Sequence, residues 1–370
     1  MTKHTEEGTA LNAICAYFTM FPLDFPYSIL KQYSSKGEWV LDPFCGRGTT
    51  NYASRILGLP SVGIDSNPVA VALSQAKLAN SSPQLIERVT LRILDEVETP
   101  KDIPTGEFWE WAFDKDVLQT ICRLREGLLN DCRSDSRKAL RAIILGALHG
   151  PRGKEKQSYF SNQAPRTYAP KPRYSVNFWK QRALTPQYVN VIEIIKERAQ
   201  RYFSNKLPNS MGNIIRGDSR KKSTYFRLKT NSKINWVITS PPYYGIRTYL
   251  PDQWLRCWFM GRPQDVQYSA EGQLEHSSKD GFALELKQVW QNVGLVCNQG
   301  AKLIVRFGAI NSRKTDSLKL IKQSFIETGW RIQTLRSAGS ASKGRRQAYH
   351  FSDRNKEPLE EYDVWAIWEG

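Results

Sequence analysis

The stretch EWVLDPFCGRGTTNYASRILGLPSVGID, residues 38–65, contains two short apolar segments separated by a glycine-containing turn and a helical pattern. WVLD is an apolar run that ends in an acid, and CGRG follows it as a turn. YASRILGL carries apolar residues at helical spacing, and SVGID is a second short apolar run. A strand, a turn, a helix and a second strand in this order predict a right-handed βαβ unit.

The same alternation of strands and helices returns near the end of the chain. Strand-like runs appear at GNIIRGD, INWVITSPP, GAKLIVRFG, GWRIQTLRSAG and YDVWAIWEG, and FALELKQVWQNVGLV has a helical pattern. Residues 91–205 interrupt the alternation with two helical segments and a loop-like stretch over residues 151–190. We therefore predict an α/β fold: one Rossmann-like, mostly parallel sheet with helices on both faces and a large insertion.

The chain is strongly basic. It has 53 Lys and Arg against 36 Asp and Glu, a net charge of +17 and a pI near 9.6. A summed positive potential of this size favours a polyanionic partner, and nucleic acid is the commonest one. Charge alone also fits a basic protein without such a partner.

The sequence also bears on location and metals. No apolar run approaches the ~20 residues that a membrane helix needs, and MTKHTEEGTALNAI lacks the basic start and apolar core of a signal peptide. The six cysteines are scattered without a CxxC pair, and the four histidines do not cluster near them. We expect a cytoplasmic protein with free thiols and no zinc site.

The glycine-containing turn after WVLD indicates a ligand site, because glycines let a backbone approach a ligand closely. A phosphate-binding loop would need Gly-Lys-Ser/Thr, and a dinucleotide fingerprint would need a third glycine near Asn51; neither pattern is met. Asp65 ends the next strand, 17 residues after Gly48, where a carboxylate can accept two ribose hydroxyls. A ribose-bearing ligand without a pyrophosphate fits best, and a helix cap before Pro68 is the alternative role for Asp65.

LDPFCGRGTT, residues 41–50, resembles the S-adenosylmethionine-binding motif of the DNA amino-methyltransferases, whose usual form is DPFxGxGTT. Arg47 stands where a small residue is usual, which puts in doubt what lies over the methionine moiety. The resemblance implies S-adenosyl-L-methionine as the cofactor, with contacts from Asp42, Pro43, Phe44, Gly46, Gly48, Thr49, Thr50 and Asp65.

Two further segments are similar to cofactor contacts of the same family. AYFTMFP, residues 16–22, resembles the segment that covers the methionine end, which implies a contact from Phe21; a simple apolar residue before a helix is the alternative. Asp218 in IIRGDSR resembles the acid that contacts the adenine amino group, and an ordinary turn is the alternative.

INWVITSPPYYG presents a rigid edge of hydrogen-bond acceptors. Two prolines fix φ near −65° and remove two backbone donors, which leaves carbonyl oxygens. An exocyclic base amine is a poor nucleophile because its lone pair is delocalised into the ring. The Ser240 hydroxyl and the Pro241 carbonyl are placed to accept its protons, and Tyr243 is placed to stack on a base extruded from the duplex.

TSPPYYG resembles the catalytic motif of this family, [SDN]PP[YFW], which implies catalytic roles for Ser240, Pro241, Pro242 and Tyr243. In the family a leading serine usually accompanies cytosine N4, so we expect cytosine-N4 methylation, with adenine N6 as the alternative. Methylation at cytosine C5 is disfavoured because it needs a Pro-Cys pair, and no cysteine here follows a proline. The implied mechanism is direct displacement, which needs no metal.

The window 151–190 is the expected DNA-reading surface. It contains eight Lys or Arg and seven aromatic residues against one acid, Glu155. A solvated loop around a small aromatic core is the alternative. A helix over residues 248–261 is expected beneath the catalytic segment, with an Asp252–Arg256 ion pair. The expected nucleic-acid contacts are Arg152, Lys154, Lys156, Arg166, Lys171, Arg173 and Lys180, with Arg345 and Arg346 from a second basic stretch.

These features together predict a site-specific DNA methyltransferase acting on double-stranded DNA, in a restriction-modification or related defence system with possible cognate proteins. Residues 1–90 are the expected cofactor-binding half, 91–205 the candidate target-recognition insertion and 206–370 the catalytic half. The insertion precedes Asp218, so the permutation class stays open. The alternatives are an adenine-N6 enzyme, an RNA-directed amine methyltransferase and a catalytically silent nucleic-acid-binding protein.

Overall fold

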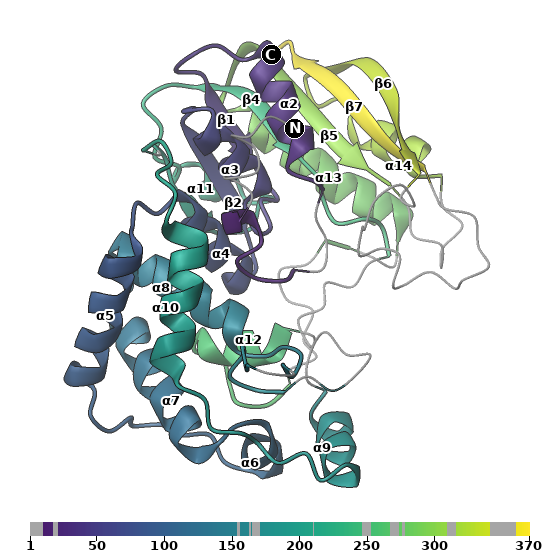
Figure 1. Ribbon diagram of the computed structural model, residues 1–370. Helices are drawn as coiled ribbons and strands as arrows, with labels where there is room; N and C mark the ends of the chain where they lie inside the picture. Colours follow the sequence, from purple (N-terminus) through teal and green to yellow (C-terminus); the bar gives the residue numbers. More distant parts are fainter. Residues whose placement is uncertain are drawn as a thin grey trace. The chain divides into compact units, whose positions relative to one another are not determined.

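A computed structural model describes residues 10–17, 21–153, 156–162, 164, 171–209, 211–245, 253–266, 274–275, 278–308, 316–340 and 360–370 (Figure 1). The chain divides into two compact units. The helical unit comprises Met1–Ala16, Ala79–Lys206 and Tyr249–Ser269, and the sheet unit comprises Tyr17–Leu78, Leu207–Thr248 and Ala270–Gly370. Along the described stretches, no helix has the length and apolarity needed to cross a membrane.

The sheet unit is built on seven strands in the order β3-β2-β1-β4-β5-β7-β6. Neighbouring strands from β3 to β5 run parallel, whereas β7 is antiparallel to both β5 and β6. The predicted mostly parallel sheet is thus confirmed. The strands are β1 (Trp39–Asp42), β2 (Ser61–Asp65), β3 (Ile214–Arg216), β4 (Ile234–Thr239), β5 (Cys297–Phe307), β6 (Trp330–Ser340) and β7 (Glu360–Trp368).

The middle of this sheet is buried on both faces, because its strands are almost wholly apolar. Alternate side chains enter two cores: Leu41 and Val237 pack in one, whereas Val40 and Ile238 pack in the other. The first core is completed by α13 (Lys279–Gly294) and α14 (Ser317–Ser324), and the second by α2 (Asp24–Tyr33) and α3 (Thr49–Ile56). Helices on both faces are therefore confirmed. The remaining helices are α4 (Pro68–Leu78) and the single turn α11 (Lys222–Tyr225).

The helical unit is made of α-helices with clear start signals. Ser82, Asp114, Ser134 and Asn190 precede four of them, and each side chain accepts a hydrogen bond from a first-turn amide. The helices are α5 (Pro83–Glu96), α6 (Glu107–Ala112), α7 (Lys115–Asn130), α8 (Asp135–Ala147), α9 (Pro172–Gln181), α10 (Val191–Phe203) and α12 (Trp254–Phe259).

One local prediction in this unit was wrong, and a second was confirmed in part. The loop-like window contains α9, which starts with Pro172 in the first turn and buries Val176 and Trp179. The helix expected over residues 248–261 is present as α12, which belongs to the helical unit and packs Trp254 against Phe108 with 4.9 Å between ring centroids. Asp252 lies outside the described residues. Arg256 donates instead to Leu145 O, Ala16 O and Gln253 Oε1.

Candidate active site

Three acids follow three neighbouring strands of the sheet unit. Asp42 ends β1, Asp65 ends β2, and Asp218 comes two residues after β3. Ser240 follows the next strand on the other side, β4. Because these four strands are parallel, their carboxyl ends lie at one edge of the sheet, where open α/β sheets bind ligands. The structure therefore brings together the predicted cofactor acids and the predicted catalytic segment.

The glycine-containing turn, residues 43–48, passes over the end of β2, with Cys45 N donating to Ile64 O at 2.9 Å. Gly48 has a φ of +76°, and a Cβ there would lie 2.7 Å from Ser74 Oγ, so α4 leaves room for glycine only. Gly46 also has a positive φ, +51°, but the nearest atom to a Cβ there would be 4.0 Å away. Gly48 is required by packing, whereas Gly46 faces open space.

Asp65 holds this turn in place. Its Oδ2 accepts a hydrogen bond from Gly46 N, and its Oδ1 accepts one from Asn67 N, both at 2.8 Å. The cap of α4 is Asn67, whose Oδ1 accepts from Val69 N at 2.9 Å. Each carboxylate oxygen of Asp65 keeps further acceptor capacity for ligand hydroxyls. Burial raises the pKa of Asp65 to about 6.

Asp42 is completely buried, and it links β1 to β4. Its Oδ1 accepts hydrogen bonds from Thr239 Oγ1 at 2.6 Å and from Phe44 N at 3.1 Å. Its Oδ2 has no hydrogen-bond partner in the described part of the chain. Burial raises the pKa of Asp42 to about 6, against the lowering effect of these hydrogen bonds. A second link runs from Thr50 Oγ1 to Ile238 O at 3.0 Å.

The segment 240–243 leaves the end of β4 with no backbone donor at Pro241 or Pro242. Pro241 is buried, and Ser240 and Tyr243 are partly buried. Tyr243 Oη donates to Glu361 Oε1 at 3.0 Å, and its ring meets Phe307 edge-on with 5.5 Å between centroids. Burial, together with the nearby carboxylate of Glu361, holds the pKa of Tyr243 well above its usual value.

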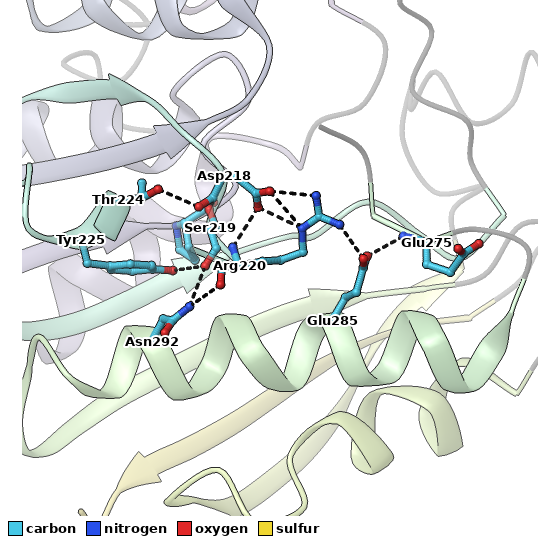
Figure 2. A network of polar contacts seen from close by, with 9 residues as sticks. Asp218, Ser219, Arg220, Thr224, Tyr225, Glu275, Glu285 and Asn292 are labelled. Carbon is cyan, nitrogen blue, oxygen red and sulfur yellow. Dashed lines mark hydrogen bonds and ion pairs between the residues drawn. The ribbon is translucent and has the colours of Figure 1, made fainter. Parts of the chain in front are cut away.

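Asp218 lies in a loop that is attached to the glycine-containing turn. Ser219 Oγ donates to Pro43 O at 2.5 Å, and Tyr225 Oη donates to Ser219 O at 3.1 Å. The side chain of Arg220 lies between Asp218 and Glu285 of α13 (Figure 2). Ser219, Arg220 and Thr239 were not predicted as site residues. Ser219 and Thr239 contact residues far away in the sequence, and Arg220 joins its neighbour Asp218 to the distant Glu285, so no local pattern indicated them.

Comparison with known proteins finds relatives of this chain. Residues 2–76, which include the glycine-containing turn and Asp65, match the N6_N4_Mtase family model, described as DNA methylase. The chain is related to the N6/N4 DNA methylases. Type II methyltransferase M.MjaII from Methanocaldococcus jannaschii is 21% identical in an alignment that covers 81% of this chain and 71% of that protein.

A second relative aligns over a shorter region. Type II methyltransferase M.MthZI from Methanothermobacter thermautotrophicus is 33% identical over 78 residues, so the alignment covers 21% of this chain and only 22% of that protein. Among solved structures, TrmN from Thermus thermophilus matches 99% of this chain and 52% of that chain, with 8% identity and a TM-score of 0.37. A score this low supports no argument, so the fold assignment rests on the strand order.

The residues at the sheet edge fit the cofactor of this methylase family, S-adenosylmethionine. Asp65 has spare acceptor capacity for a ribose, and Gly46 leaves open space beside it. The unpartnered Oδ2 of Asp42 suits a donor or a cationic group. The glycine-containing turn and the acids beside it therefore offer hydrogen-bond acceptors and space for a ligand that combines a ribose with a positive charge.

The N-terminal segment of the methylase match is placed in part. Phe21 packs against Phe25 of α2, with 5.3 Å between centroids. Tyr17, which was not predicted as a site residue, accepts a hydrogen bond at its Oη from Asn67 Nδ2 at 3.2 Å. Tyr17 is thus the residue of this segment that lies beside the Asp65 turn. Arg47 is buried, with 7% of its surface exposed.

The predicted nucleic-acid contacts differ in their surroundings. Lys156 forms an ion pair with Glu197, and Lys180 forms one with Glu107. Lys171 and Arg173 are exposed at the start of α9, and Arg152 is partly buried. Lys154, Arg166, Arg345 and Arg346 lie outside the described residues.

The exposed face of α9 also carries aromatic groups. Tyr174 stacks on Phe178 with 6.4 Å between centroids, and the guanidinium of Arg182 lies 4.1 Å from the Phe178 ring centroid. Arg182 was not among the predicted contacts. Other aromatic residues of the window, such as Phe160 and Trp179, are buried, and Trp179 packs against Phe108 of α6 with 5.9 Å between ring centroids.

Proposed function

We propose that this chain is a DNA methyltransferase that transfers a methyl group from S-adenosylmethionine to an exocyclic amine of a DNA base, with the N4 amine of a flipped cytosine favoured. The hydrogen bond of 2.6 Å between Thr239 Oγ1 and Asp42 Oδ1 carries this proposal. It holds the end of β4, from which the Ser-Pro-Pro-Tyr segment leaves, against the end of β1, from which the cofactor loop leaves.

The chain's own residues supply orientation and hydrogen-bond acceptors. Ser240 and Pro241 are the expected acceptors for the protons of the target amine, and Pro242 keeps the backbone of this edge rigid. Tyr243 is the expected stacking surface for the base, which recovers ~1–3 kcal/mol of the cost of leaving the duplex. When bound, S-adenosylmethionine supplies the methyl group on a positively charged sulfur. The buried acid Asp42 favours that charge over a neutral product.

The choice of base rests on Ser240. Serine at the first position of this motif resembles the cytosine-N4 form, and adenine N6 remains the alternative. Both amines are conjugated with their ring and need the same kind of acceptor edge, so the mechanism is common to both.

We place DNA recognition in the helical unit and the chemistry in the sheet unit. The exposed face of α9, with Lys171, Arg173, Tyr174 and Arg182, supports this assignment because it combines cations with aromatic rings. The names of the curated relatives, both type II methyltransferases, support a role in a restriction-modification system with a cognate nuclease as partner.

The first test is a methyl-transfer assay with labelled S-adenosylmethionine and genomic DNA, followed by identification of the labelled nucleoside by mass spectrometry. We expect N4-methylcytosine. N6-methyladenine would keep the mechanism and overturn the base assignment. Label on RNA alone would overturn the DNA assignment, and cofactor binding without transfer to either acceptor would favour a silent binding protein. The matched control is Ser240→Ala. This variant should bind the cofactor as wild type does but transfer less label, so it measures the background.

A further inference from the structure

The carboxylate of Asp218 is held at both oxygens by one residue, Arg220. Oδ1 accepts from Arg220 N and from Arg220 Nε, each at 2.9 Å. Oδ2 accepts from Nη2 at 2.8 Å, with Nε at a longer 3.2 Å. This is the two-point geometry in which arginine binds a carboxylate most strongly. Figure 2 shows the guanidinium lying against this carboxylate.

Arg220 is itself anchored at its far end. Nη1 donates to Glu285 Oε1 at 2.5 Å, and the other oxygen of Glu285 accepts from Glu275 N at 2.6 Å. Asn292, also on α13, donates from Nδ2 to Arg220 O at 2.8 Å. The guanidinium is therefore fixed between two carboxylates and cannot turn away from Asp218 without breaking its contact with Glu285.

Asp218 keeps acceptor capacity in this arrangement. A carboxylate oxygen has about two acceptor sites, and Oδ1 uses both on Arg220. Oδ2 accepts from Nη2 at 2.8 Å, and its 3.2 Å contact with Nε shares the single Nε hydrogen with the closer Oδ1, so Oδ2 can accept a further hydrogen bond from a ligand. About a fifth of the Asp218 side chain is exposed, 22%, so the group is reachable.

Arg220 also favours the ionised form of Asp218. Partial burial raises its pKa, but hydrogen bonds from Arg220 outweigh this, so the pKa of Asp218 is lowered. An ionised carboxylate accepts hydrogen bonds and donates none. It therefore attracts the 6-amino group of adenine and repels the 6-oxo group of hypoxanthine.

We propose that Arg220 is a positioning residue that makes the cofactor site selective for adenine over hypoxanthine, by holding Asp218 as an oriented, acceptor-only carboxylate. This inference rests on the proposed function and on the resemblance that assigns Asp218 to the purine of S-adenosylmethionine. It adds the residue on which that selectivity depends.

The test compares S-adenosylhomocysteine with S-inosylhomocysteine, whose purines differ in the group at position 6 and in the proton on N1, by titration calorimetry. We expect the wild-type protein to prefer the adenosyl ligand by roughly 10-fold to 100-fold, the range for a hydrogen bond to a charged group. Arg220→Met should reduce this preference to about 3-fold or less. Arg220→Lys, which keeps the charge but loses the two-point contact, should give an intermediate preference and serves if the Met variant fails to fold.

The matched control is Arg227→Met, in the same loop. Arg227 is exposed and donates to Arg216 O, so its loss should leave the preference unchanged. A second readout is pH: as the pH falls toward about 4, the preference should shrink in Arg220→Met before it shrinks in wild type. Arg220 lowers the pKa of Asp218, so without it the carboxyl takes up a proton at a higher pH and can donate to the 6-oxo group.

Each result separates the two proposals. Equal weakening of both ligands in Arg220→Met would show a merely structural role and overturn the inference. Wild-type binding without preference would overturn it while leaving the methyltransferase proposal in place. Wild-type binding of neither ligand would overturn the cofactor assignment itself.

Discussion

The hydroxyl of Tyr243 donates a hydrogen bond of 3.0 Å to Glu361, which lies 118 residues further along the chain on β7. Glu361 is buried, with 7% of its surface exposed, and Phe307 of β5 supports the tyrosine ring from the side. The aromatic side chain of the catalytic segment is thus held at two points by strands that the sequence motif does not include. These two strands therefore fix the orientation of the Tyr243 ring, which is the surface expected to stack on a flipped base.

Removal of the Tyr243 ring is expected to slow methyl transfer without weakening cofactor binding. Tyr243→Ala should lower kcat by about 5-fold to 150-fold, the range that corresponds to ~1–3 kcal/mol of lost stacking. Tyr243→Phe keeps the ring but loses the contact with Glu361, so its effect should be smaller. Single-turnover kinetics and calorimetry give the two quantities. Wild-type turnover in Tyr243→Ala would exclude a stacking role.

Asp42→Asn is expected to stabilise the protein above pH 6 and to weaken cofactor binding. The folded-state pKa of Asp42, about 6, lies above the ordinary value of 3.8 for an aspartate, so the folded state retains the proton between these values. Stability therefore falls as the pH rises from about 4 to about 6, by up to about 3 kcal/mol for this group. Asparagine keeps an acceptor for Thr239 and removes this loss.

Urea unfolding at pH 8 should show Asp42→Asn to be about 1–3 kcal/mol more stable than wild type. Exposed Asp95 provides the control, since Asp95→Asn should change stability by less than about 0.5 kcal/mol. If Asp42→Asn were less stable than wild type at pH 8, the carboxylate would be stabilising rather than strained. A fall in stability between about pH 4 and 6 would then have to come from a group other than Asp42.

The two glycines of the cofactor loop are expected to respond differently to alanine. Gly48→Ala places a Cβ 2.7 Å from Ser74 Oγ and 2.9 Å from Ser74 Cα, in addition to its positive φ. We expect a loss of about 2–5 kcal/mol in the free energy of unfolding. Gly46→Ala meets no close atom, so it should cost only about 1–2 kcal/mol, the left-handed backbone strain.

The same pair tests the cofactor site. A methyl group at Gly46 enters the open space beside Asp65, so Gly46→Ala should weaken S-adenosylhomocysteine binding beyond what its stability change explains. Thermal unfolding and calorimetry on the same samples separate the two effects. Equal stability losses at both positions would contradict the different surroundings described for them.

The exposed cations of α9 are expected to contact DNA phosphates. Arg173→Gln and Arg182→Gln should each weaken DNA binding across sequences and reduce the slope of log K against log salt by ~0.9 per lost phosphate contact. Lys156→Gln is the comparison, because Lys156 already pairs with Glu197 and should change the slope less. Fluorescence anisotropy over a range of salt concentrations measures these slopes. Unchanged slopes in both arginine variants would show that DNA binds at a different surface of the protein.

The parts of the site that could be predicted from sequence are those made by consecutive residues. Asp42 to Thr50 and Ser240 to Tyr243 each combine a strand end with a turn, and apolar periodicity together with glycine and proline indicates both. The window around α9 was predicted to be loop-like, although α9 has Pro172 in its first turn, where proline is well tolerated. Its buried face, Ser175, Val176 and Trp179, is a helical pattern only once the start is known.

The sequence by itself determined the α/β class, the mostly parallel sheet and the two loops that carry the proposed chemistry, because these depend on hydrophobic period and local backbone preference. Only the tertiary structure decided that Thr239 contacts Asp42, that Glu361 holds Tyr243, and that Arg220 links Asp218 to Glu285. The physical reason is separation along the chain. Strand order and helix packing set which distant side chains meet, and a single hydrogen bond between them leaves no periodic trace in the sequence.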